Sequence, residues 1–111
     1  MAALPILNQQ KGPLPIKIEF SSPTDAPATI MVTGSVWSQT ANVIIGIEVY
    51  IDGKPIGSSS IYSNLQATHR ATVATYIPVT IPFGPHQLAL EPLNANTVSD
   101  INDFFDAVLM Y

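Results

Sequence analysis

The feature that most constrains this chain is an alternation of apolar and polar side chains that repeats every second residue. It is clearest between residues 43 and 52, where five β-branched residues occupy alternate positions: Val43, Ile45, Ile47, Val49 and Ile51. A period of two places successive side chains on opposite faces of a strand, so this segment predicts a β-strand with one buried face. Apolar residues do not recur at helical spacing, and ten prolines interrupt the chain, so no long helix is expected.

The same pattern recurs along the rest of the chain. Further strands are predicted at residues 15–20, 28–38, 54–60, 71–81, 86–90 and 104–111. Asp52-Gly53 predicts a tight turn, because both residues accept positive φ angles, and Pro78 indicates a bend or a sheet edge. About seven short strands, with turn-forming residues every 8 to 12 positions, predict an all-β, two-sheet antiparallel β-sandwich. Its connectivity is expected to be immunoglobulin-like or jelly-roll.

The length of 111 residues suits one domain of ordinary size. Residues 15–111 are expected to form the β-sandwich. Residues 1–14 lack the alternation and contain three consecutive amide side chains at positions 8–10, so they are interpreted as an N-terminal arm or an edge segment.

Two segments resemble the immunoglobulin-like β-sandwich modules of bacterial proteins. IEVYIDGKPIG at residues 47–57 looks like the central hairpin of such modules, and GPHQLAL at residues 84–90 looks like their penultimate strand. The resemblance implies adhesion, display or spacing between modules, and it implies no particular ligand.

Composition argues against several classes of partner. Only four basic residues accompany eight acidic ones, for a net charge of -4, so the chain lacks the basic surface that nucleic acids and anionic membranes attract. No apolar run approaches the roughly 20 residues of a membrane-spanning helix, and the first residues do not look like a secretory signal. Cysteine is absent, which excludes disulfides and thiolate chemistry and leaves the compartment open.

Catalytic machinery is not evident in the sequence. The chain has two histidines, His69 and His86, and the serines at 58–60 lack the motif of a hydrolase nucleophile. We therefore expect no catalytic residues and a non-catalytic protein, with a small hydrolase as a lesser alternative.

One acidic segment has the oxygen-rich composition of a cation site. Asp100, Asn102, Asp103 and Asp106 fall within seven residues, and hard cations such as calcium take oxygen ligands of this kind. The same residue types also form turns by bonding to their own backbone. A capped turn without a cofactor is one interpretation of this segment, and a calcium site formed by these residues is the other.

Four aromatic residues are candidates for a ligand surface: Trp37, Tyr50, Tyr62 and Tyr76. Flat rings with polar tips can stack on sugars, which predicts a lectin-like face. The alternative is that these rings fill a core or an oligomer interface, where aromatic residues are also enriched.

Two of the predicted strands are apolar on both faces. In the last strand, Phe104, Val108 and Met110 lie opposite the alternate set Phe105, Ala107 and Leu109. A single sandwich covers only one face of each sheet. We therefore predict a closed homo-oligomer, for example a trimer, and a non-catalytic module for self-assembly or adhesion. The alternative function is a carbohydrate-binding module, in one form calcium-dependent.

Overall fold

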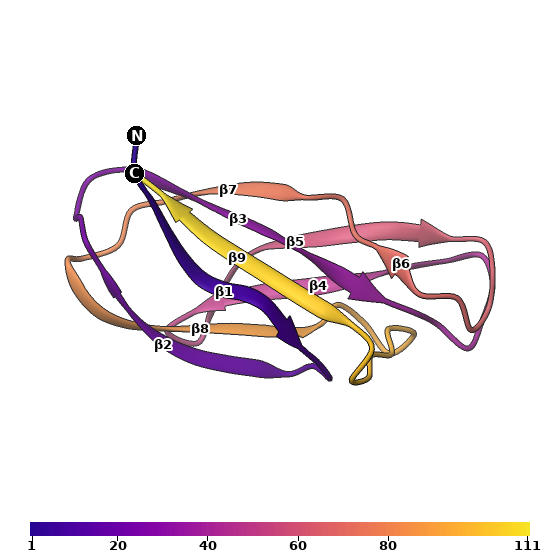
Figure 1. The fold of residues 1–111 in the computed structure, drawn as a ribbon. Coiled ribbons are helices and arrows are strands. Elements are labelled where there is room, and N and C mark those ends of the chain that lie inside the picture. Colours follow the sequence, from indigo (N-terminus) through magenta and orange to yellow (C-terminus); the bar gives the residue numbers. More distant parts are fainter.

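The computed structural model describes all residues from 1 to 111 and contains nine β-strands (Figure 1). In chain order they are β1 (Ala3–Lys11), β2 (Ile16–Ser22), β3 (Ala28–Val36), β4 (Val43–Ile51), β5 (Lys54–Ser63), β6 (Arg70–Ala71), β7 (Thr75–Val79), β8 (Gly84–Pro92) and β9 (Phe104–Met110). The chain forms no helix of the length and apolarity needed to cross a membrane.

The strands form two antiparallel sheets. The four-stranded sheet has the order β2-β8-β4-β5, and the other has the order β1-β9-β3 with β6 and β7 both paired to β3. β7 pairs with Ala28–Val32, and β6 pairs with Ser35 and Val36 farther along the same strand. The predicted all-β, two-sheet sandwich is confirmed.

The connectivity distinguishes between the two predicted forms of sandwich. The β4–β5 hairpin joins hydrogen-bonded neighbours, and apart from the short link between β6 and β7 every other connection passes from one sheet to the other. Immunoglobulin domains keep several hairpins within their sheets. The order β1-β9-β3-β7 facing β2-β8-β4-β5 is that of a jelly roll. The resemblance to immunoglobulin-like modules therefore extends to the sandwich and not to the order of its strands.

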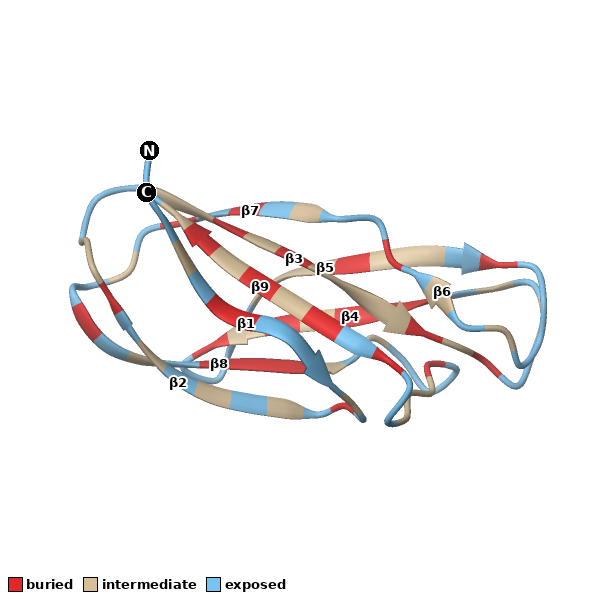
Figure 2. Ribbon diagram, viewed as in Figure 1, coloured by how far each residue is buried: buried red, intermediate tan, exposed pale blue.

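The core lies between the sheets and follows the alternation in the sequence. In β4 the alternate residues from Ile45 to Ile51 are buried, and buried and intermediate bands alternate along β9 (Figure 2). The core contains 17 buried apolar residues, and Phe105 is the largest side chain that is fully buried.

The predicted turn at Asp52-Gly53 connects β4 to β5. Asp52 has a φ of 51° and Gly53 a φ of 81°, the positive values that a tight two-residue hairpin requires. The hairpin pairs Ile51 with Lys54 and continues to the pair of Val43 with Ser63.

The N-terminal segment forms β1, which pairs with β9 at one edge of the five-stranded sheet. Its register shifts twice along this pairing, and the shift between Pro5 and Leu7 lets the neighbours Ile6 and Leu7 both be buried. This bulge interrupts the simple alternation, which is why the sequence pattern did not indicate a strand here.

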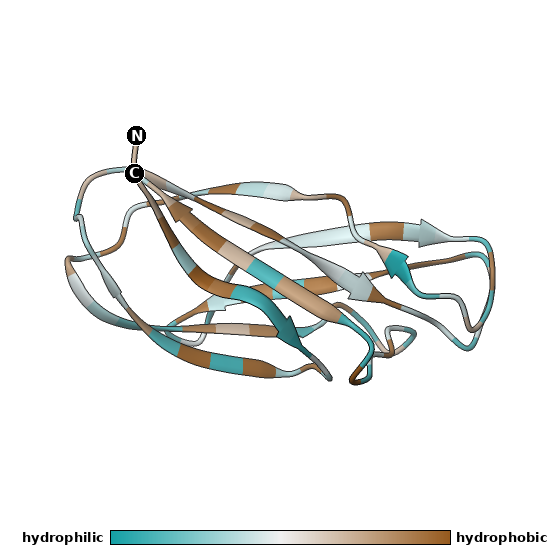
Figure 3. Ribbon diagram, in the orientation of Figure 1, coloured by the Kyte–Doolittle hydropathy of each residue, from teal (hydrophilic) through white to brown (hydrophobic).

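β9 is apolar on both faces, as predicted. Phe105, Ala107 and Leu109 point into the core, whereas Phe104 is exposed and Val108 and Met110 are half-buried on the outer side. Figure 3 shows brown, hydrophobic bands along most of β9, whereas brown and teal bands alternate along β2. Apolar side chains thus remain partly exposed to solvent on the outside of the five-stranded sheet.

Candidate functional site

Several loops meet at the end of the sandwich that lies away from the chain termini (Figure 1). Backbone bonds tie these loops together. Trp37 N donates to Val98 O at 2.9 Å and Val98 N to Trp37 O at 2.8 Å, and Ala67 N donates to Ser38 O at 2.7 Å. The loops after β3, β5 and β8 therefore form one connected surface, which we call the loop end.

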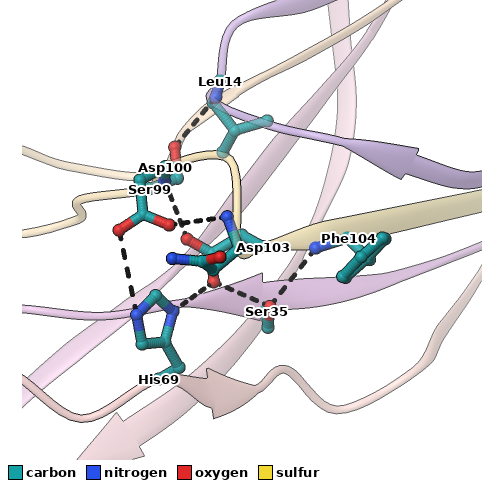
Figure 4. A network of polar contacts seen from close by, with 8 residues as sticks. Leu14, Ser35, His69, Ser99, Asp100, Asp103 and Phe104 are labelled. Carbon is teal, nitrogen blue, oxygen red and sulfur yellow. Dashed lines mark hydrogen bonds and ion pairs between the residues drawn. The ribbon is translucent and has the colours of Figure 1, made fainter.

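At the loop end the buried carboxylate of Asp103 organises a polar network (Figure 4). Its Oδ1 accepts hydrogen bonds from Ser35 Oγ at 2.7 Å and from His69 Nδ1 at 2.6 Å. Its Oδ2 accepts from Asp100 N at 2.8 Å. Three donors satisfy this buried group, as burial of a charge requires, and they join β3, the loop after β5 and the loop before β9.

The arrangement around His69 does not match a hydrolase triad. Ser35 and His69 both bond to Asp103, so the serine hydroxyl is not bonded to the imidazole that would have to activate it. Ser59, one of the serines considered from the sequence, bonds instead to Thr72 Oγ1 and to the Val73 carbonyl. These contacts place no serine as a nucleophile at the ring of His69.

The structure brings together some of the residues predicted to bind a metal. Asp100 and Asp103 join His69 in a group whose ligand atoms lie within 4.8 Å of one another. Asn102 lies in the same turn, and its backbone N donates to Asp100 Oδ1 at 2.8 Å. Asp106 lies farther along the chain on β9, where its Oδ1 accepts from Gln9 N at 2.8 Å.

His69 was not among the metal ligands predicted from the sequence. It precedes Asp103 by 34 residues, and no local motif links the two. The only available signal was the presence of a histidine in a chain that has just two.

The four aromatic residues predicted to bind a ligand do not form one platform. Trp37 follows β3, and its buried Nε1 has no hydrogen-bond partner in the chain. Tyr50 and Tyr62 both face outward on the four-stranded sheet, but they lie far apart. Tyr62 pairs with Ile44, which is six residues, or about 20 Å, from Tyr50 along β4. Tyr76, which is 62% exposed, lies on β7 in the other sheet. A sugar-binding role for these four residues stays a prediction.

The second histidine forms a separate pair near the β4–β5 turn. His86 Nδ1 contacts Asp52 Oδ2 at 2.5 Å, and His86 Nε2 contacts the Pro82 carbonyl at 2.6 Å. The hydrogen bond to Asp52, followed by the one to Pro82, raises the pKa of His86 above its ordinary value. The same bond to His86, followed by one from the backbone N–H of Gln87, lowers the pKa of Asp52. Both ring nitrogens are thus occupied, and together they link the β4–β5 turn to the segment before β8.

The outer side of the five-stranded sheet carries two neighbouring rows of mostly apolar residues. Cross-strand pairing places Pro5, Val108, Met31 and Tyr76 in one row across four strands, beside a second row that contains Met110 and Pro78. These six residues are called the apolar face below. One end of it opens into a shallow groove of about 780 Å³, which Tyr76, Pro78 and Met110 line together with Met1 and Tyr111.

The outer side of the four-stranded sheet has the opposite character. Lys17, Glu19, Glu48 and Glu91 alternate there with the inward-facing residues of β2, β4 and β8. The charged residues of this side lie beside Tyr50 and Tyr62, whereas the apolar face defined above contains no charged residue.

Comparison with known proteins supports the fold. No protein-family model matches the chain, and no curated protein matches it. Among solved structures, dimeric latent PorU from Porphyromonas gingivalis matches 97% of this chain with a TM-score of 0.59 and 8% identity, and the chain spans only 12% of that protein. At this identity the likeness shows a shared β-sandwich and nothing finer.

Two further solved structures match at lower scores. The carbohydrate-binding module CBM36, solved with calcium and xylotriose, has a TM-score of 0.48 and 15% identity, with 97% of this chain and 98% of that one covered. The C-terminal domain of EclA, a sugar-binding protein, has a TM-score of 0.47 and 16% identity, with coverage of 96% and 76%.

Proposed function

We propose that this chain is a non-catalytic binding module that associates with a second copy of itself through the apolar face. The observation that carries the proposal is the row of Pro5, Val108, Met31 and Tyr76, which crosses four strands without a charged residue. Apolar patches of this kind on a soluble protein mark interaction surfaces.

Charge explains why a second copy suits this surface. With a net charge of -4, two copies repel each other unless they meet where acidic groups are few. Asp106 is the acidic residue of β9 nearest the apolar face, and its carboxylate is already bonded to Gln9 N. On the opposite side of the sandwich, contact would bring Glu19, Glu48 and Glu91 against their own copies, which costs free energy.

Geometry is compatible with a symmetric dimer. Sheets pack face to face at about 10 Å, with side chains interdigitating as they do within a sandwich. A two-fold axis through the apolar face would place each row against its own copy in a closed, isologous contact. We therefore favour a dimer over the trimer suggested by sequence.

Light scattering after size exclusion tests this proposal. The wild-type chain is expected to be a dimer at micromolar concentration. Tyr76→Lys, at an exposed position, and the double variant Tyr76→Lys/Val108→Lys should weaken dimerisation about tenfold or more. Each dimer would bury two uncompensated charges in the single variant and four in the double variant. Ser58→Lys, on the outer side of the four-stranded sheet, is the matched control and should leave the dimer intact.

Two outcomes would reject self-association through this face. One is a wild-type chain that stays monomeric at high micromolar concentration. The other is a dimer that Ser58→Lys disrupts as strongly as the Tyr76 variants do. Circular dichroism of each variant separates loss of association from loss of fold.

A second candidate function is sugar binding at the loop end. A depression of about 220 Å³ there is lined mainly by uncharged polar side chains, which are Ser38, Gln39, Thr40 and Asn96. Hydroxyl and amide groups both donate and accept hydrogen bonds, as recognition of sugar hydroxyls requires. A glycan array, run with and without calcium, tests this candidate. Binding that Gln39→Ala abolishes would support it, and an array without hits would remove it.

A further inference from the structure

The two histidine–aspartate pairs differ in one respect that matters for ligand binding. In the His86 pair both ring nitrogens are bonded, to Asp52 and to the Pro82 carbonyl. In the His69 pair, Nδ1 bonds to Asp103, while Nε2 makes no hydrogen bond and lies 3.8 Å from Asp100 Oδ2. A proton on Nδ1, directed at the Asp103 carboxylate, leaves Nε2 with a lone pair.

Asp100 likewise has one side-chain oxygen that makes no hydrogen bond within the chain. Its Oδ1 accepts a hydrogen bond from Asn102 N, whereas its Oδ2 makes no hydrogen bond and faces His69 Nε2. The side chains of His69 and Asp100 are each 39% exposed, so an ion from solvent can reach both atoms.

The distance between these two atoms fits a shared ion. Metal–nitrogen and metal–oxygen bonds are about 2.0–2.2 Å long for zinc, so two ligand atoms on one ion are at most about 4.3 Å apart. We propose that His69 Nε2 and Asp100 Oδ2 bind a divalent transition-metal ion such as zinc or cobalt, with water completing its coordination. Asp103 is the positioning residue, because its hydrogen bond fixes the tautomer and orientation of the imidazole.

The ligand chemistry favours a transition metal over calcium. Calcium takes six to eight oxygen ligands, but the oxygens of Asp103 and Oδ1 of Asp100 are already occupied by hydrogen bonds. Imidazole nitrogen suits zinc and the neighbouring first-row metals. Of the ligands predicted from sequence, Asp100 thus binds directly and Asp103 acts through His69.

Trp37 provides a reporter for this site. It is the only tryptophan in the chain, and the centre of its ring lies 5.9 Å from that of His69. A cobalt ion bound at His69 Nε2 is therefore close enough to quench its fluorescence.

The experiment is a titration of the metal-free chain with cobalt(II), followed by tryptophan fluorescence. Saturable quenching is expected, with zinc reversing it in competition and calcium at the same concentration leaving it unchanged. His69→Ala and Asp100→Asn should each weaken the apparent affinity for cobalt about tenfold or more. His86→Ala is the matched control and should titrate like the wild type. Zinc should also raise the melting temperature of the wild type, because it binds the folded chain and joins two loops.

Three results would overturn the proposal. They are the absence of saturable quenching, quenching that His69→Ala and Asp100→Asn leave unchanged, and displacement of cobalt by calcium as readily as by zinc. Asp100 is half-exposed, so Asp100→Asn keeps the test valid if His69→Ala does not fold.

Discussion

The pair of His86 and Asp52 makes the fold sensitive to pH at the scale of single residues. The pKa of His86 is raised above its ordinary value of 6.5, mainly by its hydrogen bond to Asp52. Stability from this shift is fully present below pH 6.5 and is lost as the pH rises through the folded-state value. The pKa of Asp52 is lowered below 3.8 by the same bond, so its contribution is present above pH 3.8 and is lost as the pH falls through the folded-state value. The pair therefore stabilises the fold most between about pH 3.8 and pH 6.5.

We expect the free energy of unfolding to decrease as the pH rises above about 6.5. Urea denaturation at a series of pH values measures this dependence. His86→Gln cannot titrate and should show a flatter profile between pH 6 and pH 9. Superimposable profiles for the variant and the wild type would contradict the role assigned to this pair.

At the scale of elements, the packing of β3 against β9 depends on a position without a side chain. A Cβ at Gly34 would lie 2.4 Å from Cδ1 of Phe105 and 2.9 Å from the Phe104 carbonyl oxygen. The Phe105 ring is fully buried in the core, so it has little room to move away.

Gly34→Ala is expected to destabilise the fold by about 1–3 kcal/mol, as overpacking of a core does. The midpoint of urea denaturation measures this loss. Ser58→Ala, on the outer side of β5, is a control that should change stability by less than about 0.5 kcal/mol. If Gly34→Ala were as stable as the control, β3 and β9 could separate locally without loss of stability, which would contradict the prediction.

Regular alternation determined which elements the sequence could predict. β2, β4 and β9 begin and end within two residues of the predicted bounds, because inward- and outward-facing side chains alternate along each of them. The predicted strand at 71–81 is divided into β6 and β7. Between them Thr72 turns inward to bond with Ser59, leaving Val73 exposed. A buried polar contact of this kind leaves no periodic trace.

The polar cluster at the loop end was less accessible to sequence analysis than the strands. Asp100 and Asp103 were identified because they lie close together in the sequence. Their contact with His69 depends on how two loops from different parts of the chain meet. Loop conformations are not encoded by a period, so only the folded structure shows the imidazole beside the carboxylates.

At the scale of the whole molecule, the two proposed sites occupy different parts of an elongated sandwich. The molecule measures 42 × 24 × 21 Å along its principal axes. Along β9, Val108 lies four residues, or about 13 Å, from Phe104, the neighbour of Asp103. No residue of the apolar face belongs to the His69 network, so self-association and metal binding should be independent.

This independence gives a prediction that neither site gives alone. Tyr76→Lys is expected to weaken dimerisation. Its titration with cobalt should still give an apparent affinity within about twofold of the wild-type value, because two sites without coupling free energy do not change each other's affinity. Reciprocally, His69→Ala should dimerise like the wild type in light scattering. A tenfold change in either direction corresponds to about 1.4 kcal/mol of coupling. Such a change would mean that dimer formation reorganises the loops that hold His69 and Asp100, or that the second copy contacts them directly.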